Sequence, residues 1–102
     1  MQSDNKLKSK ELDYLFEAIL KLQSREECYS FFEDICTISE LQALAQRMVV
    51  AKMLSDKVTY QEISKETGAS TATISRVNRC VAYGAGGYNL VLERLEGVEL
   101  GG

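Results

Sequence analysis

The chain has 102 residues, of which 45% are hydrophobic and 26% charged, and its formal net charge at pH 7 is −3. This size and composition indicate one folded domain rather than a disordered chain, with about two-thirds of the unfolded chain's surface buried on folding. No apolar run approaches the ~18 residues of a membrane span, and no secretory core follows the polar N-terminus. We therefore expect a soluble, cytoplasmic protein with no membrane partner.

Histidine is absent, so the usual general base and the commonest metal ligand are both missing. The three cysteines, Cys28, Cys36 and Cys80, have no C-x-x-C spacing, and any pairing leaves one over. This arrangement does not indicate a disulfide framework or a zinc site. We expect reduced thiols, no metal, no catalytic residues and no enzymatic activity.

Proline is absent, and this favours long helices and an all-α fold of about six helices. Apolar residues at three- and four-residue spacings predict a first helix at about residues 6–22. Ser24 is a suitable N-cap for a second helix, which should end near Asp34 or Ile35.

A third helix is predicted to begin at the capping box formed by Thr37 and Glu40 and to run to Leu54 or Ser55. Its apolar residues lie on more than one side, which exceeds what one core face of a small domain requires. We expect the first three helices to bury this excess surface in a homodimer. The alternative is a central helix that its own chain encloses.

Residues 59–81 have the pattern of a helix, a tight glycine turn and a second helix. Thr59 and Glu62 form a capping box at the start, Gly68 suits a left-handed turn residue, and Ser70 can cap the next helix. The apolar residues expected to hold the two helices together are Ile63, Ala69, Ile74 and Val77.

The second helix of this unit begins with the small side chains of Thr71, Ala72 and Thr73. A helix with a slim N-terminal end can approach base edges closely in a major groove. The cationic side chains available for phosphate contacts are Lys57, Lys65, Arg76 and Arg79. The pattern therefore predicts binding to double-stranded DNA, with an ordinary helical hairpin as the alternative.

The distribution of charge along the chain is compatible with DNA binding despite the net negative charge. Residues 1–36 contain five basic and eight acidic side chains, residues 37–81 contain six and four, and residues 82–102 contain one and three. The middle segment is therefore the positive one. Phosphate contact requires a local cationic face and not a basic protein, although non-specific DNA binding should be weak.

The glycine-rich stretch from Tyr83 to Tyr88 is expected to be a flexible elbow before a last helix. It lacks a following Gly-Lys-Ser/Thr and a preceding strand, so it does not indicate a nucleotide cradle. The predicted organisation is a disordered N-terminus at 1–5, a single all-α domain at 6–96 and a flexible tail at 97–102.

The third helix and the helix-turn-helix together resemble the Trp repressor family, and within it the YerC/YecD-like branch. The residues that carry the resemblance are Thr37, Leu41, Ala43, Leu44, Arg47, Gly68-Ala69, Ala72-Thr73-Ile74 and Ser75-Arg76. The resemblance covers about residues 33–96. It implies an all-α, intertwined homodimer that represses transcription by binding an operator.

By position, this resemblance places operator contacts on both helices of the unit. The implied DNA-binding residues, together with the capping and cationic ones described above, are Gln61, Ser64, Lys65, Ser70, Thr71, Ala72, Thr73, Ser75, Arg76 and Arg79. Gln61 stands where the Trp repressor has an arginine. Arginine pairs with guanine, whereas glutamine suits adenine or a phosphate, so a different operator sequence is expected.

The resemblance also implies a small-molecule corepressor site, formed by Thr37, Arg47, Arg76, Val77 and Cys80. Arg47 and Arg76 match the two arginines that sandwich the tryptophan ring in the family. Val77 and Cys80 replace a glycine and a serine, so a branched side chain intrudes and a hydroxyl is lost. An amino acid such as tryptophan, or no effector at all, both remain open, and the arginines could instead pair with Glu40 or Asp34.

Two classes of function therefore remain at this point. The first is a dimeric, sequence-specific transcriptional regulator that binds a palindromic operator. The alternative is a helical protein–protein interaction module that does not bind DNA, which the overall acidity and the apolar third helix favour.

Overall fold

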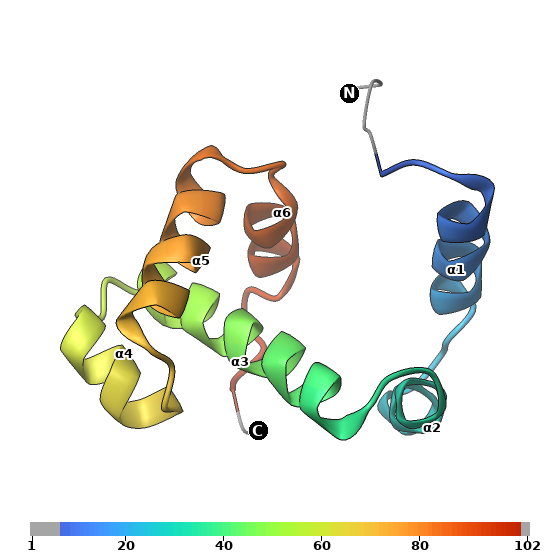
Figure 1. The fold of residues 1–102 in the computed structure, drawn as a ribbon, viewed down its shortest axis with the longest axis horizontal. Helices are drawn as coiled ribbons and strands as arrows, with labels where there is room; N and C mark the ends of the chain where they lie inside the picture. The colour runs from blue at the N-terminus through green and yellow to red at the C-terminus, as the bar shows by residue number, and fades with distance from the viewer. Residues whose placement is uncertain (1–6, 101–102) are drawn as a thin grey trace. The chain divides into compact units, whose positions relative to one another are not determined.

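The computed structural model describes residues 7–100, and these form six α-helices and no strand (Figure 1). The helices are α1 (Lys10–Leu20), α2 (Arg25–Ile35), α3 (Ile38–Ser55), α4 (Tyr60–Thr67), α5 (Thr71–Tyr83) and α6 (Gly87–Arg94). The predicted all-α class is confirmed. Among these helices none combines the length and the apolarity needed to cross a membrane. The N-terminal segment predicted to be disordered, 1–5, lies outside the described residues.

The described chain falls into two compact units, which divide between Thr37 and Ile38. The first contains α1 and α2. Both helices begin where a serine caps them: the Leu12 N–H donates to Ser9 Oγ and the Glu27 N–H donates to Ser24 Oγ, each at 3.1 Å. The Ser9 cap explains why α1 begins later than the predicted residue 6.

Neither α1 nor α2 contains a buried residue. Several of their large apolar side chains are open to solvent in the single chain; the side chains of Tyr14 and Leu20 are 80% and 74% exposed. Phe31 and Phe32 pack edge to face within α2, with ring centroids 5.3 Å apart. The first unit therefore leaves an apolar surface that its own helices do not cover.

The second unit is built on α3, which packs against α4, α5 and α6, while α5 also contacts α4 and α6 (Figure 1). Its buried core draws on α3, α4, the turn after α4, and α5. The core residues are Val50, Ala51, Ile63, Ala69, Ile74 and Val77. All four apolar residues predicted to hold the helix-turn-helix together belong to this core.

The N-caps and the turn glycine predicted for the helix-turn-helix are confirmed. The Glu62 N–H donates to Thr59 Oγ1 at 3.2 Å, and the Thr73 N–H donates to Ser70 Oγ at 3.1 Å. Gly68 ends α4 with φ 76°, in the left-handed region that side chains rarely adopt. The turn is therefore fixed by the left-handed conformation of Gly68 and by the cap that Ser70 provides at the start of α5.

Part of the segment predicted to be a flexible tail lies beside α3 and α6. Val98, Glu99 and Leu100 lie with α3 and α6 side chains around a cavity of about 170 Å³. Residues 101–102 lie outside the described part.

Candidate nucleic-acid interface

The N-terminal end of α5 presents the small side chains of Thr71 and Ala72 to solvent. Ile74 and Val77, on the opposite side of the same helix, are buried against the core. No acidic residue occupies the first turn of α5, so the partial positive charge of the helix N-terminus is not neutralised by a carboxylate in this turn. This end of α5 is slim, exposed and suited to a polyanion.

The remaining residues of the predicted DNA face lie on both helices and on the turn. Gln61, Lys65, Ser70, Arg76 and Arg79 are exposed, whereas Ser64, Thr73 and Ser75 are half-buried. Packing between α4 and α5 brings the two helices of the set together. Each of these residues retains exposed surface, as a DNA contact requires.

The cationic side chains of this face are not paired within the second unit's described residues. In this part of the chain Lys52 Nζ forms an ion pair with Asp56 Oδ2 at 2.8 Å, and this pair involves none of Lys65, Arg76 and Arg79. Their charges therefore remain available to phosphates.

Lys57 lies in the loop that leads from α3 into α4 and has an unusual backbone conformation. Its φ is 66°, the one positive value among the described residues other than glycine. The Val58 N–H donates to the Met53 carbonyl and the Lys57 N–H to the Leu54 carbonyl, each at 3.0 Å. This is the Schellman pattern that ends a helix, with lysine at the position where glycine is preferred.

A cavity of about 420 Å³ lies between α3, α5 and α6. Its lining residues are Ala43, Gln46, Arg47, Thr73, Arg76, Val77, Cys80 and Tyr88. Four of the five residues predicted for a ligand site are therefore brought together here. The fifth, Thr37, belongs to the first unit, and its role stays a prediction.

The chemistry of this cavity is mixed. Arg47 and Arg76 contribute guanidinium groups, Thr73 a hydroxyl and Cys80 an exposed thiol, and neither arginine enters an ion pair within the second unit's described residues. Val77 is 1% exposed and its side chain belongs to the core as well as to the cavity wall. The arrangement suits a small molecule that carries an anionic group.

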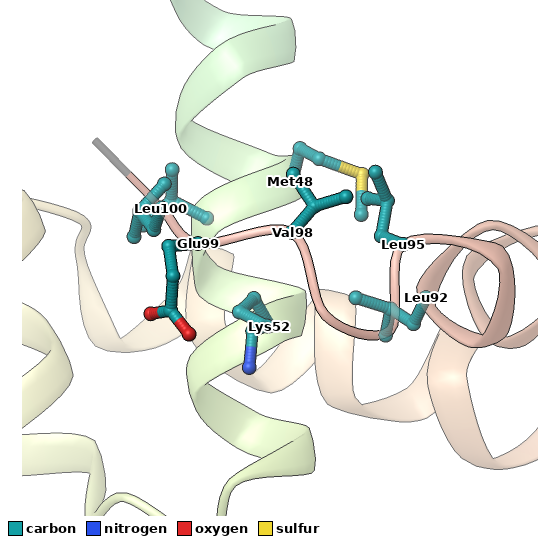
Figure 2. Close-up of a pocket in the computed structure, with 8 residues that line it drawn as sticks. Met48, Lys52, Leu92, Leu95, Val98, Glu99 and Leu100 are labelled. Carbon is teal, nitrogen blue, oxygen red and sulfur yellow. The ribbon is translucent and has the colours of Figure 1, made fainter. Parts of the chain in front are cut away.

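The second cavity, around the C-terminal segment, is more apolar (Figure 2). Met48, Leu95 and Val98 point toward one another in it. At its edge, the hydrogen bond that Lys52 donates to Asp56 raises the pKa of Lys52; burial opposes this effect, and the negative charges of Asp56 and Glu99 add to it. The residues that line this cavity are mainly apolar, whereas the cavity between α3, α5 and α6 contains the guanidinium groups of Arg47 and Arg76.

Gln46 and Tyr88 were not predicted as site residues, although both line the larger cavity. Gln46 is a polar residue of α3 directly before Arg47, which was predicted to line the ligand site. That position was the available signal. Tyr88 carried no comparable signal, because aromatic residues at helical spacing usually belong to a core.

Comparison with known proteins agrees with this geometry. The family model described as Trp repressor protein matches residues 10–96. The chain is 58% identical to the uncharacterized protein YerC of Bacillus subtilis strain 168, over 97% of this chain and 94% of that protein.

Two crystal structures have the same fold. A TrpR-like protein from Eubacterium eligens is 55% identical with a TM-score of 0.88, over 94% of this chain and 99% of that one. A candidate Trp repressor from Staphylococcus aureus is 50% identical with a TM-score of 0.87, over 94% and 96%. The chain belongs to the Trp repressor family.

Proposed function

We propose that this protein is a sequence-specific DNA-binding transcriptional regulator, and most simply a repressor that occludes a promoter. The observation that carries the proposal is the N-terminal end of α5, where Thr71 and Ala72 are exposed above a buried core. A slim, rigidly held helix end can enter a major groove and bring its side chains to base edges. Membership of the Trp repressor family supports the same function.

The regulator acts as a homodimer on a near-palindromic operator. Support comes from the uncovered apolar side chains of α1 and α2, which a second copy would bury. Two α5 helices related by a two-fold axis would enter successive major grooves, about 34 Å apart, as in helix-turn-helix dimers including the Trp repressor. The two half-sites should therefore be separated by about one helical turn.

The DNA-binding face is tested by removing the charge of Arg79. Because Arg79 is exposed on α5, we expect Arg79→Ala to weaken binding to all sequences and to reduce the slope of log affinity against log salt by about one. Arg94→Ala, at another exposed arginine at the end of α6, is the matched control and should keep the slope. An unchanged slope for Arg79→Ala would contradict the proposed face.

Sequence preference should depend on a different set of side chains. Thr71 and Thr73 lie at the N-terminal end of α5, where side chains reach base edges. Changing either to alanine should alter the preferred bases in a selection from random duplexes. If the variants lose affinity by the same factor for every DNA sequence, neither threonine contacts a base.

Control by a small ligand is proposed for the cavity that contains Arg47 and Arg76. Calorimetry against a panel of amino acids tests it. A heat signal for tryptophan that disappears in Arg47→Ala would identify tryptophan as the corepressor. Silence across the panel would favour a regulator without an amino-acid effector.

The competing function is a protein-interaction module, which the exposed apolar residues of the first unit favour. A mobility-shift experiment with random genomic fragments separates the two classes. Selective retention of particular fragments supports the regulator. No retention at low salt supports the interaction module, because electrostatic DNA binding is strongest there.

A further inference from the structure

Gln46 joins α3 to the end of α4 through one hydrogen bond. Its side-chain Nε2 donates to the carbonyl oxygen of Thr67 at 3.1 Å, across 21 residues of sequence, and the contact is partly buried. Thr67 is the last residue of α4, so its carbonyl has no acceptor role within the helix. The amide of Gln46 therefore satisfies a backbone group that the end of the helix leaves open.

Thr67, which accepts the hydrogen bond from Gln46, lies where the turn between α4 and α5 begins. The Thr67 hydroxyl donates to the Ile63 carbonyl at 2.7 Å and accepts from the Ala69 N–H at 3.0 Å. The Gly68 N–H donates to the Ser64 carbonyl at 2.8 Å. Thr67 thus fixes the backbone on both sides of Gly68, and Gln46 fixes Thr67.

Gln46 also lines the cavity that contains Arg47 and Arg76, and so does Thr73. The Thr73 N–H donates to Ser70 Oγ, and this hydrogen bond caps the start of α5. The cavity wall therefore includes one residue that holds the end of α4 and one that belongs to the first turn of α5.

We propose that Gln46 is a positioning residue: it sets the angle at which α5 is presented to DNA, and it transmits occupancy of the cavity to the turn. The inference rests on the proposed DNA-binding function. A molecule in the cavity that attracts the Gln46 amide removes the donor from Thr67 and loosens the turn. A molecule that packs beside Gln46 without competing for the amide holds the turn closed.

The positioning role is tested with Gln46→Leu, which keeps a similar volume and removes the donor. We expect DNA affinity about three- to tenfold lower, the effect of one lost hydrogen bond, and an unchanged salt slope because no phosphate contact is lost. Amide hydrogen exchange should accelerate at Ala69 and Thr73 and stay unchanged in α6. Gln42→Leu, an exposed glutamine on the same helix, is the matched control and should change none of these.

Several outcomes would overturn the positioning role. Wild-type affinity in Gln46→Leu would do so, and so would a salt slope reduced by one, which would make Gln46 a phosphate contact. Exchange that accelerates equally everywhere would mark a purely structural residue. If the wild-type protein fails to bind DNA, the proposed function fails, while exchange at the turn still decides whether Gln46 holds it.

The link to the cavity is tested with a covalent probe. In a protein with Cys28→Ser and Cys36→Ser, iodoacetamide alkylates the exposed thiol of Cys80 and places an amide group at the cavity wall. Alkylation should change DNA affinity when Gln46 is present, and this change should shrink at least threefold in Gln46→Leu. An equal change in both backgrounds would show a direct effect on DNA, and no change in either would remove the link.

Discussion

At the scale of single residues, Lys57 is the one described position where backbone and side chain conflict. A left-handed conformation at the end of a helix suits glycine, and any other residue there raises the free energy of the folded state. We expect Lys57→Gly to raise the free energy of unfolding by roughly 0.5–1 kcal/mol, after allowing for the greater freedom of glycine in the unfolded chain. Denaturant titration measures this change.

The control for this prediction is Lys57→Ala, which removes the same charge and keeps the conflict. It should leave stability unchanged or lower it. Equal stabilisation by both variants would assign the effect to charge and not to backbone conformation. If Lys57 also belongs to the cationic face, both variants should reduce the salt slope of DNA binding by about one.

Among the core residues, Ile63 is completely buried and contributes from α4 to the packing against α3 and α5. Ile63→Ala removes most of this side chain and should lower the free energy of unfolding by about 2–5 kcal/mol. This is a large part of the stability that a domain of this size has. Tyr83→Ala, at a side chain 88% exposed, should change stability by less than about 0.5 kcal/mol. A loss at Ile63 no larger than that control would contradict the assigned core.

At the scale of elements, the cap of α5 connects folding with DNA recognition. Ser70 accepts the Thr73 N–H and its hydroxyl also lies 3.1 Å from Thr73 Oγ1. Ser70→Ala should destabilise the protein by about 1 kcal/mol. Thr59→Ala removes the equivalent cap of α4 and should cost a similar amount. Thermal denaturation compares them, and a neutral Ser70→Ala would show that this cap does not limit stability.

The elements themselves were largely predictable, because their signals are local. Ser24, Thr59 and Ser70 each cap a helix within three residues, and Gly68 marks its turn through its own backbone preference. These signals depend on short segments of sequence. They gave the start of α2, α4 and α5, and the apolar residues of the helix-turn-helix gave four of the six core residues.

The missing parts were those that depend on distant contacts or unusual residues. The hydrogen bond from Gln46 to Thr67 spans 21 positions, and no local pattern predicts it. Residues 98–100 were assigned to a flexible tail, and the sequence alone did not indicate that Val98 and Leu100 lie at a cavity wall beside α3. Lys57 was recognised as a cation, whereas its left-handed backbone was not predicted because lysine rarely adopts it.

At the scale of the whole molecule, the proposed homodimer would bury the uncovered apolar surface of the first unit. Homodimerisation links unfolding to association, so the melting temperature should rise with protein concentration. A series from low to high micromolar protein, followed by circular dichroism, measures this. A melting temperature independent of concentration would indicate a protein that folds as a monomer.

The interface itself is tested at Leu20, whose side chain is 74% exposed in the single chain. Burying a leucine stabilises an interface by about 1.5–3 kcal/mol, and a two-fold dimer uses each such residue twice. Leu20→Gln should therefore raise the dimer dissociation constant at least tenfold, while the fold of each chain persists because little of this side chain is buried within it. Glu17→Gln, an exposed position on the same helix, introduces the same amide and should leave association unchanged. Sedimentation equilibrium measures both variants, and equal dissociation constants for Leu20→Gln and the wild type would exclude this face of α1 from the interface.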